Sequence, residues 1–180
     1  MYKRQLILLG HSEGALIASL AAPSVDAAGV ISLSGSARPI DQVLRQQLSN
    51  RLPPPLMLRS NELLDSLKAG RTDDNVPPQL QVIFRPSVQP YLISLFRQDP
   101  AAAFAKLKMP ALIIQGSNDI QVGVGDARLL QAAKPDAELA LIEGMNHVMR
   151  IVPNDVKRQL ASYKDPNPVS YTHLTLPTKA

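Results

Sequence analysis

The sequence predicts an α/β fold with a mostly parallel sheet of about four strands, flanking helices and a helical cap insertion. Four short apolar runs are bounded by Gly or Pro, which is typical of buried parallel strands. Segments with helical spacing of apolar residues alternate with these runs, as they do in parallel sheets with right-handed crossovers. A long helical stretch without a convincing strand separates the second run from the third.

Length and composition exclude several classes of protein. The chain has 180 residues, of which 45% are hydrophobic, so it suits one globular domain rather than a disordered chain. It has no Cys, which excludes disulfide scaffolds, thiolate zinc sites and cysteine nucleophiles. Its three His leave little material for a multi-His metal site. The net charge of +4 comes from scattered Lys and Arg, so we expect no nucleic-acid partner.

The first elements lie within residues 1–35. We predict a strand over 5–9, a helix over 13–22 and a second strand over 29–35. The basic start before the first apolar run superficially resembles a signal peptide, with Ala27 and Ala28 placed like a cleavage site. The run is only four residues long, however, whereas a secretory segment needs about 7–15. We therefore interpret the run as a strand, and we expect neither a membrane span nor export from this segment.

Residues 36–108 are interpreted as a helical cap, or lid. Their apolar residues recur at helical spacing, and prolines at 53–55 and 77–78 break the segment. A crossover that merely packs on one sheet face needs only about a dozen residues, so the length favours a lid. The predicted helices of this segment cover 41–52, 56–67, 91–96 and 101–107.

Residues 109–168 are expected to complete the sheet. We predict strands over 111–116 and 138–142 and, between them, a helix over 126–134 with Leu129 and Leu130 facing inward. From residue 169 the chain has no helical periodicity and resembles translated adapter sequence. We interpret 169–180 as a non-native tail and exclude it, together with its His173, from the functional reasoning.

One motif carries chemistry. Residues 10–14 read Gly-His-Ser-Glu-Gly and fit the pattern G-x-S-x-G, between a predicted strand and a predicted helix. In such a nucleophile elbow the central Ser12 adopts a strained backbone, the glycines allow a close backbone approach, and the hydroxyl is exposed at the carboxyl edge of the sheet. We expect His11 to pack or hydrogen-bond locally rather than to act as a base.

A serine hydroxyl needs a base, and that base needs an orienting group. Asp119 directly follows the third predicted strand and His147 directly follows the fourth, so both belong at the same sheet edge as Ser12. Asp119 alone could be a turn former, as could Asp126, and His147 alone could be an ordinary loop residue. Type, chain order and placement together favour a Ser12, Asp119 and His147 triad.

On these residues the chain resembles the α/β-hydrolases. It is similar to the serine aminopeptidase S33 or Hydrolase-4 group, which includes bacterial carboxylesterases, monoglyceride lipases and lysophospholipases. The resemblance covers roughly residues 4–167 and rests on GHSEG at 10–14, IIQGSND at 113–119 and GMNH at 144–147. It implies an α/β-hydrolase fold.

The resemblance also implies residue roles. Ser12 would be the nucleophile, His147 the base, Asp119 its orienting group, and the backbone N–H of Glu13 one half of the oxyanion hole. Gly10, His11 and Gly14 would complete the elbow.

No metal or organic cofactor is implied, and the expected partner is a small-molecule ester with an apolar acyl group. The lid residues Leu56, Leu63, Leu92 and Phe96 could line an acyl pocket or could form the core of the lid.

Departures from the family's pattern keep other interpretations open. Only four residues precede the first predicted strand, so we expect an N-terminally truncated hydrolase whose first strand is an uncovered apolar edge. We also expect a C-terminal truncation, with no closing helix after His147. The expected location is cytoplasmic. One alternative is a catalytically incomplete fragment that lacks half of the oxyanion hole. Another is amide or peptide hydrolysis or acyl transfer on the same triad.

Overall fold

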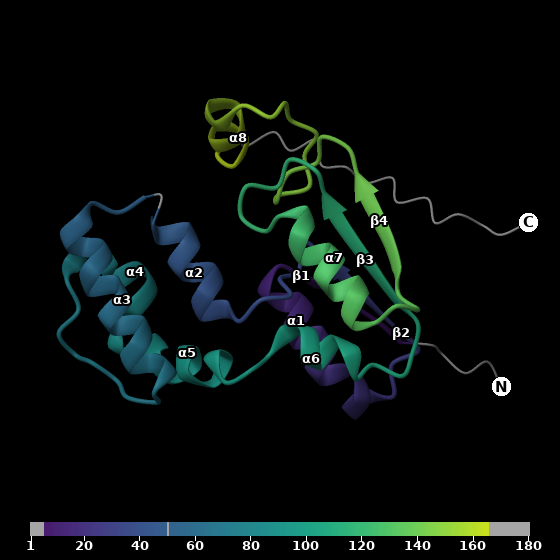
Figure 1. The fold of residues 1–180 in the computed structure, drawn as a ribbon, viewed down its shortest axis with the longest axis horizontal. Helices are drawn as coiled ribbons and strands as arrows, with labels where there is room; N and C mark the ends of the chain where they lie inside the picture. Colours follow the sequence, from purple (N-terminus) through teal and green to yellow (C-terminus); the bar gives the residue numbers. More distant parts are fainter. Residues whose placement is uncertain (1–5, 50, 166–180) are drawn as a thin grey trace, which may run out of the picture.

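The computed structural model describes residues 6–49 and 51–165. Four strands and eight α-helices, with three short 3₁₀ helices between them, make up this part of the chain (Figure 1). In chain order the elements are β1 (Ile7–His11), α1 (Glu13–Ala21), η1 (Ala22–Val25), β2 (Gly29–Leu33), α2 (Ile40–Ser49), α3 (Pro54–Lys68), η2 (Pro78–Leu80), α4 (Gln81–Phe84), η3 (Pro86–Val88), α5 (Gln89–Phe96), α6 (Pro100–Ala105), β3 (Ala111–Gly116), α7 (Val124–Ala133), β4 (Glu138–Ile142) and α8 (Val156–Ser162).

The strands form one parallel sheet in the order β1-β2-β3-β4. Gly10 pairs with Ser32 and Ser32 with Ile113, so the carboxyl ends of the strands lie in register at one edge of the sheet. Helices α1, α6 and α7 pack against one sheet face (Figure 1). This is an α/β fold with a parallel four-stranded sheet and flanking helices, as the sequence predicts.

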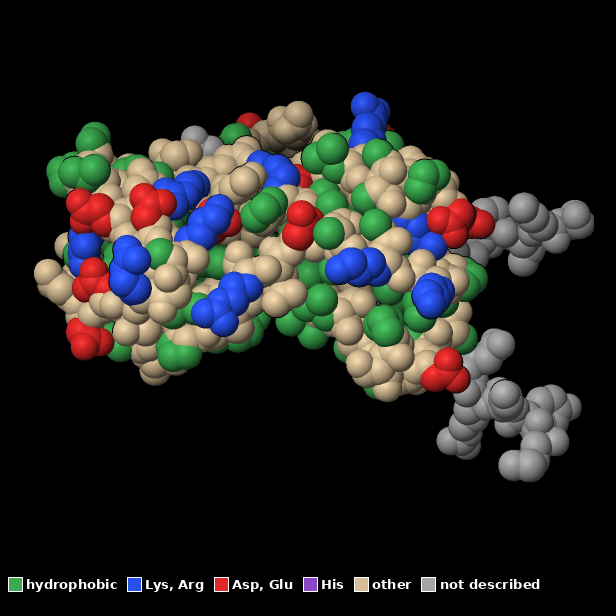
Figure 2. Space-filling view, turned by 60° about the horizontal axis from the view of Figure 1, so that its bottom comes forward, with side chains coloured by type: hydrophobic (Ala, Val, Ile, Leu, Met, Phe, Trp, Pro, Cys, Tyr) green, Lys and Arg blue, Asp and Glu red, His purple; other side chains and the backbone are tan. Residues whose placement is uncertain are grey.

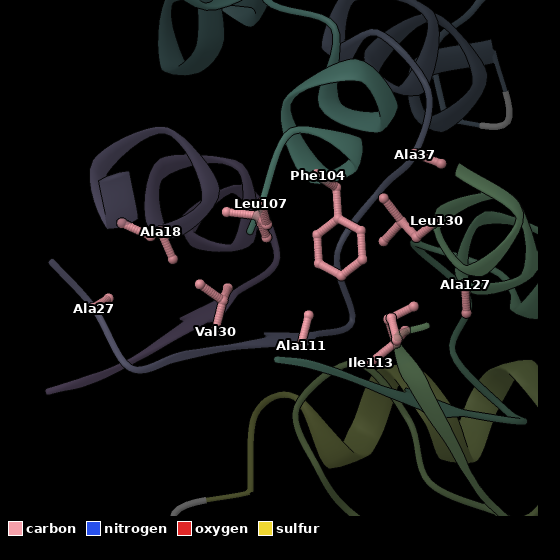
Figure 3. Close-up of a cluster of buried hydrophobic side chains, with 12 residues drawn as sticks. Ala18, Ala27, Val30, Ala37, Phe104, Leu107, Ala111, Ile113, Ala127 and Leu130 are labelled. Carbon is pink, nitrogen blue, oxygen red and sulfur yellow. The ribbon is translucent and has the colours of Figure 1, made fainter. Parts of the chain in front are cut away.

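The sheet and its helices share one apolar cluster. The Phe104 ring lies between α1, α7 and the strand residues Val30 and Ile113 (Figure 3), and it is 1% exposed. Phe104 belongs to α6 and Leu107 follows that helix, yet both lie within the segment 36–108 expected to form the cap. The last helix of that segment therefore packs with the sheet, because its apolar residues fill the space between α1 and α7.

The remaining helices of the segment form a second part of the molecule. Helices α2 to α5 lie to one side of the sheet in Figure 1 and share their own buried cluster. Leu63, Leu92 and Phe96 are buried in this cluster, and Leu56 packs against it. Most apolar residues of these helices are therefore used for packing against one another.

The structure differs from the sequence expectations at several places, including the end of β2 at Leu33 rather than at residue 35. Strand β1 extends to His11, two residues beyond the expected end. Leu129 is 52% exposed while Leu130 is 2% exposed, so only one of the two faces the core. A seven-residue helix, α8, follows His147, which contradicts the expected absence of a closing helix; the Asp155 side chain caps it by accepting the Arg158 N–H. The expected tail at 169–180 lies outside the described residues.

Among residues 6–49 and 51–165, the first strand lies at an edge of the sheet. Strand β1 is terminal in the sheet, and its Ile7 and Leu9 are 57% and 54% exposed. A strand edge without a partner and with apolar side chains is a site for association with other chains.

On the face shown in Figure 2, basic and acidic side chains are interspersed with apolar ones. Within residues 6–49 and 51–165, no helix is both long and apolar enough to cross a membrane.

Replacing Phe104 tests the cluster that joins α6 to the sheet. We expect Phe104→Ala to lower the free energy of unfolding by about 3–5 kcal/mol, because it leaves a cavity between three helices. The measurement is urea unfolding followed by circular dichroism. Val82→Ala is the control, since Val82 is 82% exposed and its truncation should change stability by no more than about 0.5 kcal/mol. Equal effects of the two substitutions would contradict the assignment of Phe104 to the core.

Candidate active site

The turn between β1 and α1 has the backbone expected of a nucleophile elbow. Ser12 has φ 55° and ψ −121°, a region that costs an L-residue about 1–3 kcal/mol. Its N–H donates to Leu33 O at 2.9 Å, so the neighbouring strand β2 holds the turn. The backbone strain therefore lies at Ser12, the residue whose hydroxyl the motif is expected to expose.

The two glycines of the motif are not equivalent. A Cβ built on Gly10 would lie 2.0 Å from the Gly14 carbonyl oxygen, so only glycine fits at Gly10. A Cβ on Gly14 would meet nothing within 4 Å. The close backbone approach therefore depends on Gly10, where the first turn of α1 passes over the end of β1.

Asp119 and His147 are in direct contact. The loops after β3 and β4 bring them together, and His147 Nδ1 lies 2.8 Å from Asp119 Oδ2. Both side chains are almost fully buried, with 6% of His147 and 0% of Asp119 exposed. Because a carboxylate only accepts, His147 Nδ1 carries the proton, which leaves Nε2 as the basic nitrogen.

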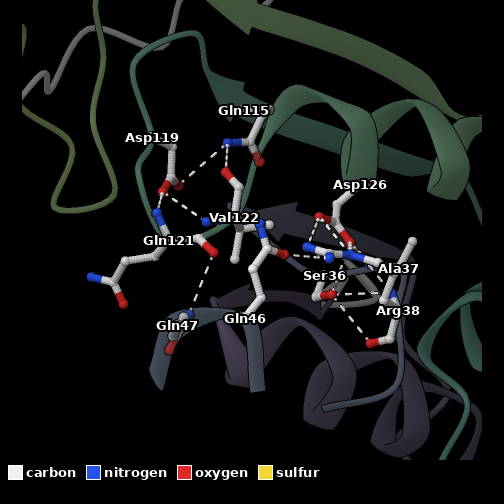
Figure 4. A network of polar contacts seen from close by, with 10 residues as sticks. All are labelled: Ser36, Ala37, Arg38, Gln46, Gln47, Gln115, Asp119, Gln121, Val122 and Asp126. Carbon is white, nitrogen blue, oxygen red and sulfur yellow. Dashed lines mark hydrogen bonds and ion pairs between the residues drawn. The ribbon is translucent and has the colours of Figure 1, made fainter. Parts of the chain in front are cut away.

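The surroundings of Asp119 keep it ionised. Burial alone would raise its pKa, but the hydrogen bond from His147 and the backbone N–H groups of Val122 and Gln121 hold the pKa below its ordinary value. The two N–H groups donate to Oδ1 at 2.9 and 2.8 Å. The loop is thus folded around the carboxylate (Figure 4).

Sequence reasoning missed Gln115. Its fully buried side chain lies on β3 and its amide donates to Asp119 Oδ2 at 3.3 Å and to Val122 O at 2.8 Å. It ties the acidic loop to the strand that precedes it. The available signal was a lone polar residue inside an otherwise apolar strand.

His11 makes a long-range contact rather than the local one expected. Its Nε2 lies 2.8 Å from the backbone carbonyl oxygen of His147, 136 residues along the chain. The two imidazole rings lie 4.8 Å apart and are tilted by 45°. Because a carbonyl oxygen only accepts, His11 carries a proton on Nε2.

Ser12 lies beside a small cavity of about 180 Å³. Its apolar wall comes from α2, through Ile40, Val43 and Leu44. Neither Leu56, Leu63, Leu92 nor Phe96 lines it, so those residues serve the cap core rather than this cavity. In the described part of the chain no hydrogen bond joins Ser12 Oγ to His147 Nε2.

A polar network fixes α2 next to this cavity (Figure 4). Asp126 on α7 is 3% exposed and binds the Arg38 guanidinium through both oxygens, at 3.0 and 2.8 Å. Ser36 Oγ donates to the same carboxylate at 2.9 Å. Arg38 also donates to Gln46 on α2 at 2.6 Å. The network joins the segment after β2 to α7 and α2. It was not foreseen because its partners are 88 residues apart.

The electrostatics of Asp126 follow from these contacts. Burial would raise its pKa, but hydrogen bonds from Arg38, Ser36 and the Ala37 N–H outweigh burial and lower the pKa from its ordinary 3.8. The carboxylate is charged at neutral pH and adds stability there.

Comparison with known proteins agrees with this geometry. Residues 2–159 match the family described as "Alpha/beta hydrolase family". The chain belongs to the alpha/beta hydrolase family. It is similar to Esterase EstD of Thermotoga maritima, with 28% sequence identity over 148 aligned residues. That alignment covers 81% of this chain and 35% of EstD, so the chain spans about a third of the length of this curated relative.

Solved structures of this hydrolase fold are also similar. A lipase-esterase related protein from Clostridium acetobutylicum has 16% identity and a TM-score of 0.50, with 90% of this chain and 67% of the other covered. Est1E from Butyrivibrio proteoclasticus, solved with ferulic acid bound, has 17% identity and a TM-score of 0.51, with 80% and 52% covered. At these identities the similarity shows the fold alone.

The contrast between the elbow glycines can be tested directly. We expect Gly10→Ala to lower the free energy of unfolding by more than about 3 kcal/mol, because its methyl group meets backbone rather than a movable side chain. Gly14→Ala is the matched control and should stabilise α1 by up to about 1 kcal/mol. Thermal and urea unfolding of both variants measure the difference. Equal tolerance of alanine at the two positions would contradict the close approach at Gly10.

The Asp126 network has a distinct pH signature. We expect Asp126→Asn to lower the free energy of unfolding by about 1–3 kcal/mol at pH 7, since buried donors lose a charged acceptor. The pKa of Asp126 is lower in the folded state than its ordinary 3.8. The stability that the ionised carboxylate adds is therefore present above the ordinary pKa and is lost as pH falls through the lower folded-state pKa. Urea unfolding at pH 7 and pH 3 measures this change.

Asp65→Asn is the control for Asp126→Asn, because Asp65 also pairs with an arginine, Arg45, but its side chain is 73% exposed. Its effect should stay within about 0.5 kcal/mol at both pH values. An Asp126→Asn effect that persists unchanged at pH 3 would contradict the ionised carboxylate.

Proposed function

We propose that this chain carries the catalytic residues of a serine hydrolase acting on carboxylic esters, with Ser12 as nucleophile, His147 as base and Asp119 as orienting group. The observation that carries the proposal is the buried hydrogen bond between Asp119 and His147. It leaves Nε2 of His147 basic at the same sheet edge as the strained Ser12 turn. The esterase homologue supports an ester as substrate.

In the proposed reaction Ser12 Oγ attacks the ester carbonyl carbon while His147 Nε2 accepts the hydroxyl proton. Asp119, already ionised, stabilises the imidazolium that forms. His147 then returns the proton to the departing alcohol oxygen, leaving an acyl group on Ser12. Water, deprotonated by His147, attacks the acyl carbon and releases the carboxylic acid.

One oxyanion donor is assigned in this proposal. Glu13 is the first residue of α1, so its backbone N–H has no partner within the helix and is placed to bind an oxyanion. The positive end of the helix dipole adds to this effect. Each such donor contributes about 10²–10³ to the rate, so a chain with one donor would be a slow catalyst.

The cavity beside Ser12 supports an apolar acyl group of small size. Its volume of about 180 Å³ compares with the roughly 150 Å³ cavities that hold benzene. Ile40, Val43 and Leu44 would contact the acyl chain. We assign α2 to α5 to a lid, with α2 as the helix nearest the substrate, whereas α6, also within the expected lid segment 36–108, packs with the sheet. We place the chain in the S33 or Hydrolase-4 group on the motifs GHSEG at 10–14, IIQGSND at 113–119 and GMNH at 144–147. Amide hydrolysis and acyl transfer would use the same three residues.

The proposal is tested with short-chain p-nitrophenyl esters. We expect measurable hydrolysis by the chain and a loss of at least about 10³-fold in kcat for Ser12→Ala. Asp119→Asn should lower kcat by up to about 10⁴-fold, because it favours the wrong His147 tautomer. Gln98→Ala, a half-buried residue between α5 and α6, is the control for handling effects.

Covalent labelling gives a second readout. A fluorophosphonate probe should modify Ser12, as located by mass spectrometry of the labelled peptide. Hydrolysis that is equal in wild type and Ser12→Ala, together with no label at Ser12, would overturn the proposal.

A further inference from the structure

His147 is held by contacts from two directions. Asp119 approaches the ring at Nδ1 from the loop after β3, at 2.8 Å. His11 approaches from the end of β1, with its Nε2 2.8 Å from the His147 carbonyl oxygen and its ring 4.8 Å from the His147 ring. Strands β1 and β4 lie at opposite edges of the sheet, so His11 reaches the far loop across β2 and β3.

The contact with Asp119 does not orient the imidazole by itself. A single hydrogen bond, together with the Cβ–Cγ bond, fixes the position of Nδ1 but restrains the tilt of the ring less closely. The direction of Nε2 would then vary, although general base catalysis needs it within hydrogen-bond reach of the reacting hydroxyl. A second contact, on the ring face or on the backbone, is required to remove this freedom.

His11 supplies both kinds of contact. The Nε2–H of His11 donates to the His147 carbonyl oxygen, and the centroid of the His11 ring lies 4.8 Å from that of the His147 ring. His11 directly precedes Ser12, so one peptide unit links the group that locates His147 to the nucleophile. The contacts of His11 with His147 therefore lie one residue from Ser12.

We propose that His11 is a positioning residue for His147, acting through its Nε2–H on the backbone carbonyl and through the contact between the two tilted rings. The proposal rests on the proposed function, in which His147 is the base. It gives the second residue of the GHSEG motif a specific task that is separate from the turn itself.

The rest of the His147 loop is held independently of His11. Asn146 Oδ1 accepts the N–H groups of Val148 and Arg150 at 3.1 and 3.0 Å. Asn118 Nδ2 donates to Val152 O at 2.7 Å. These bonds shape the loop without touching the imidazole. Removing the His11 side chain should therefore leave the loop folded but release the ring.

Three substitutions separate the two contacts. His11→Ala removes both, His11→Gln keeps a donor at the position of Nε2, and His11→Phe keeps a ring without a donor. For p-nitrophenyl ester hydrolysis we expect His11→Ala to lower kcat by about 10- to 100-fold, with KM changed less than about threefold, because a misplaced base affects the chemical step. His11→Gln should recover most of the loss and His11→Phe part of it.

A spectroscopic readout does not depend on turnover. With three His in the chain, the imidazole ¹⁵N and ¹H signals of His147 can be assigned by substitution. In wild type we expect a slowly exchanging proton at Nδ1, the nitrogen that Asp119 binds. In His11→Ala the same proton should exchange at least about tenfold faster and the ring signals should broaden.

Gln81→Ala is the matched control, because it also removes a part-buried side-chain donor to a backbone carbonyl, 2.9 Å away at Val76, but within the cap. It should change neither kcat nor the His147 signals. A His11→Ala variant that loses thermal stability while kcat and the His147 signals match wild type would overturn the proposal. Absence of hydrolysis in wild type would count against the proposed function, and the proton exchange of His147 would still decide the role of His11.

Discussion

The parallel pairing of the four strands is the constraint on which the rest of the structure depends. It brings the segments after β1, β3 and β4 to one edge of the sheet, although they are far apart along the chain. Ser12, Asp119 and His147 belong to these segments, and Asp119 and His147 are in direct contact there. The same pairing holds the strained turn at Ser12, whose N–H is bound by Leu33 of the adjacent strand. Strand order, rather than any single side chain, decides which residues can act together.

Two buried carboxylates stabilise this edge in different ways. Asp119 is surrounded by N–H donors from its own loop and by His147, which keeps its charge available to the imidazole. Asp126, seven positions later, binds Arg38 and so holds the segment after β2 against α7. Asp119 binds His147, which we propose as the base, and Asp126 fixes α2 and its cavity wall. Both are ionised because their hydrogen bonds outweigh the cost of burial.

The sequence was a good guide to local structure and a poor guide to long-range polar contacts. Gly and Pro at the ends of apolar runs predicted β3 and β4 at their observed bounds, and the motif predicted the backbone strain at Ser12. The partnerships of Arg38 with Asp126 and of His11 with His147 join residues 88 and 136 positions apart, and no local pattern encodes them. Apolar spacing on the cap helices could not separate core from pocket, since either use requires a one-sided helix.

The span between His11 and His147 also bears on how the protein assembles. Their contact closes a loop of 136 residues, and such contacts form late because the chain entropy of closure must be overcome before they contribute energy. Cap helices and the β1–α1 unit contain mostly local contacts and can form earlier. During refolding, helical signal should therefore return before the imidazole environment does. The geometry at the sheet edge is a marker of complete folding, reached only when the outermost strand is in place.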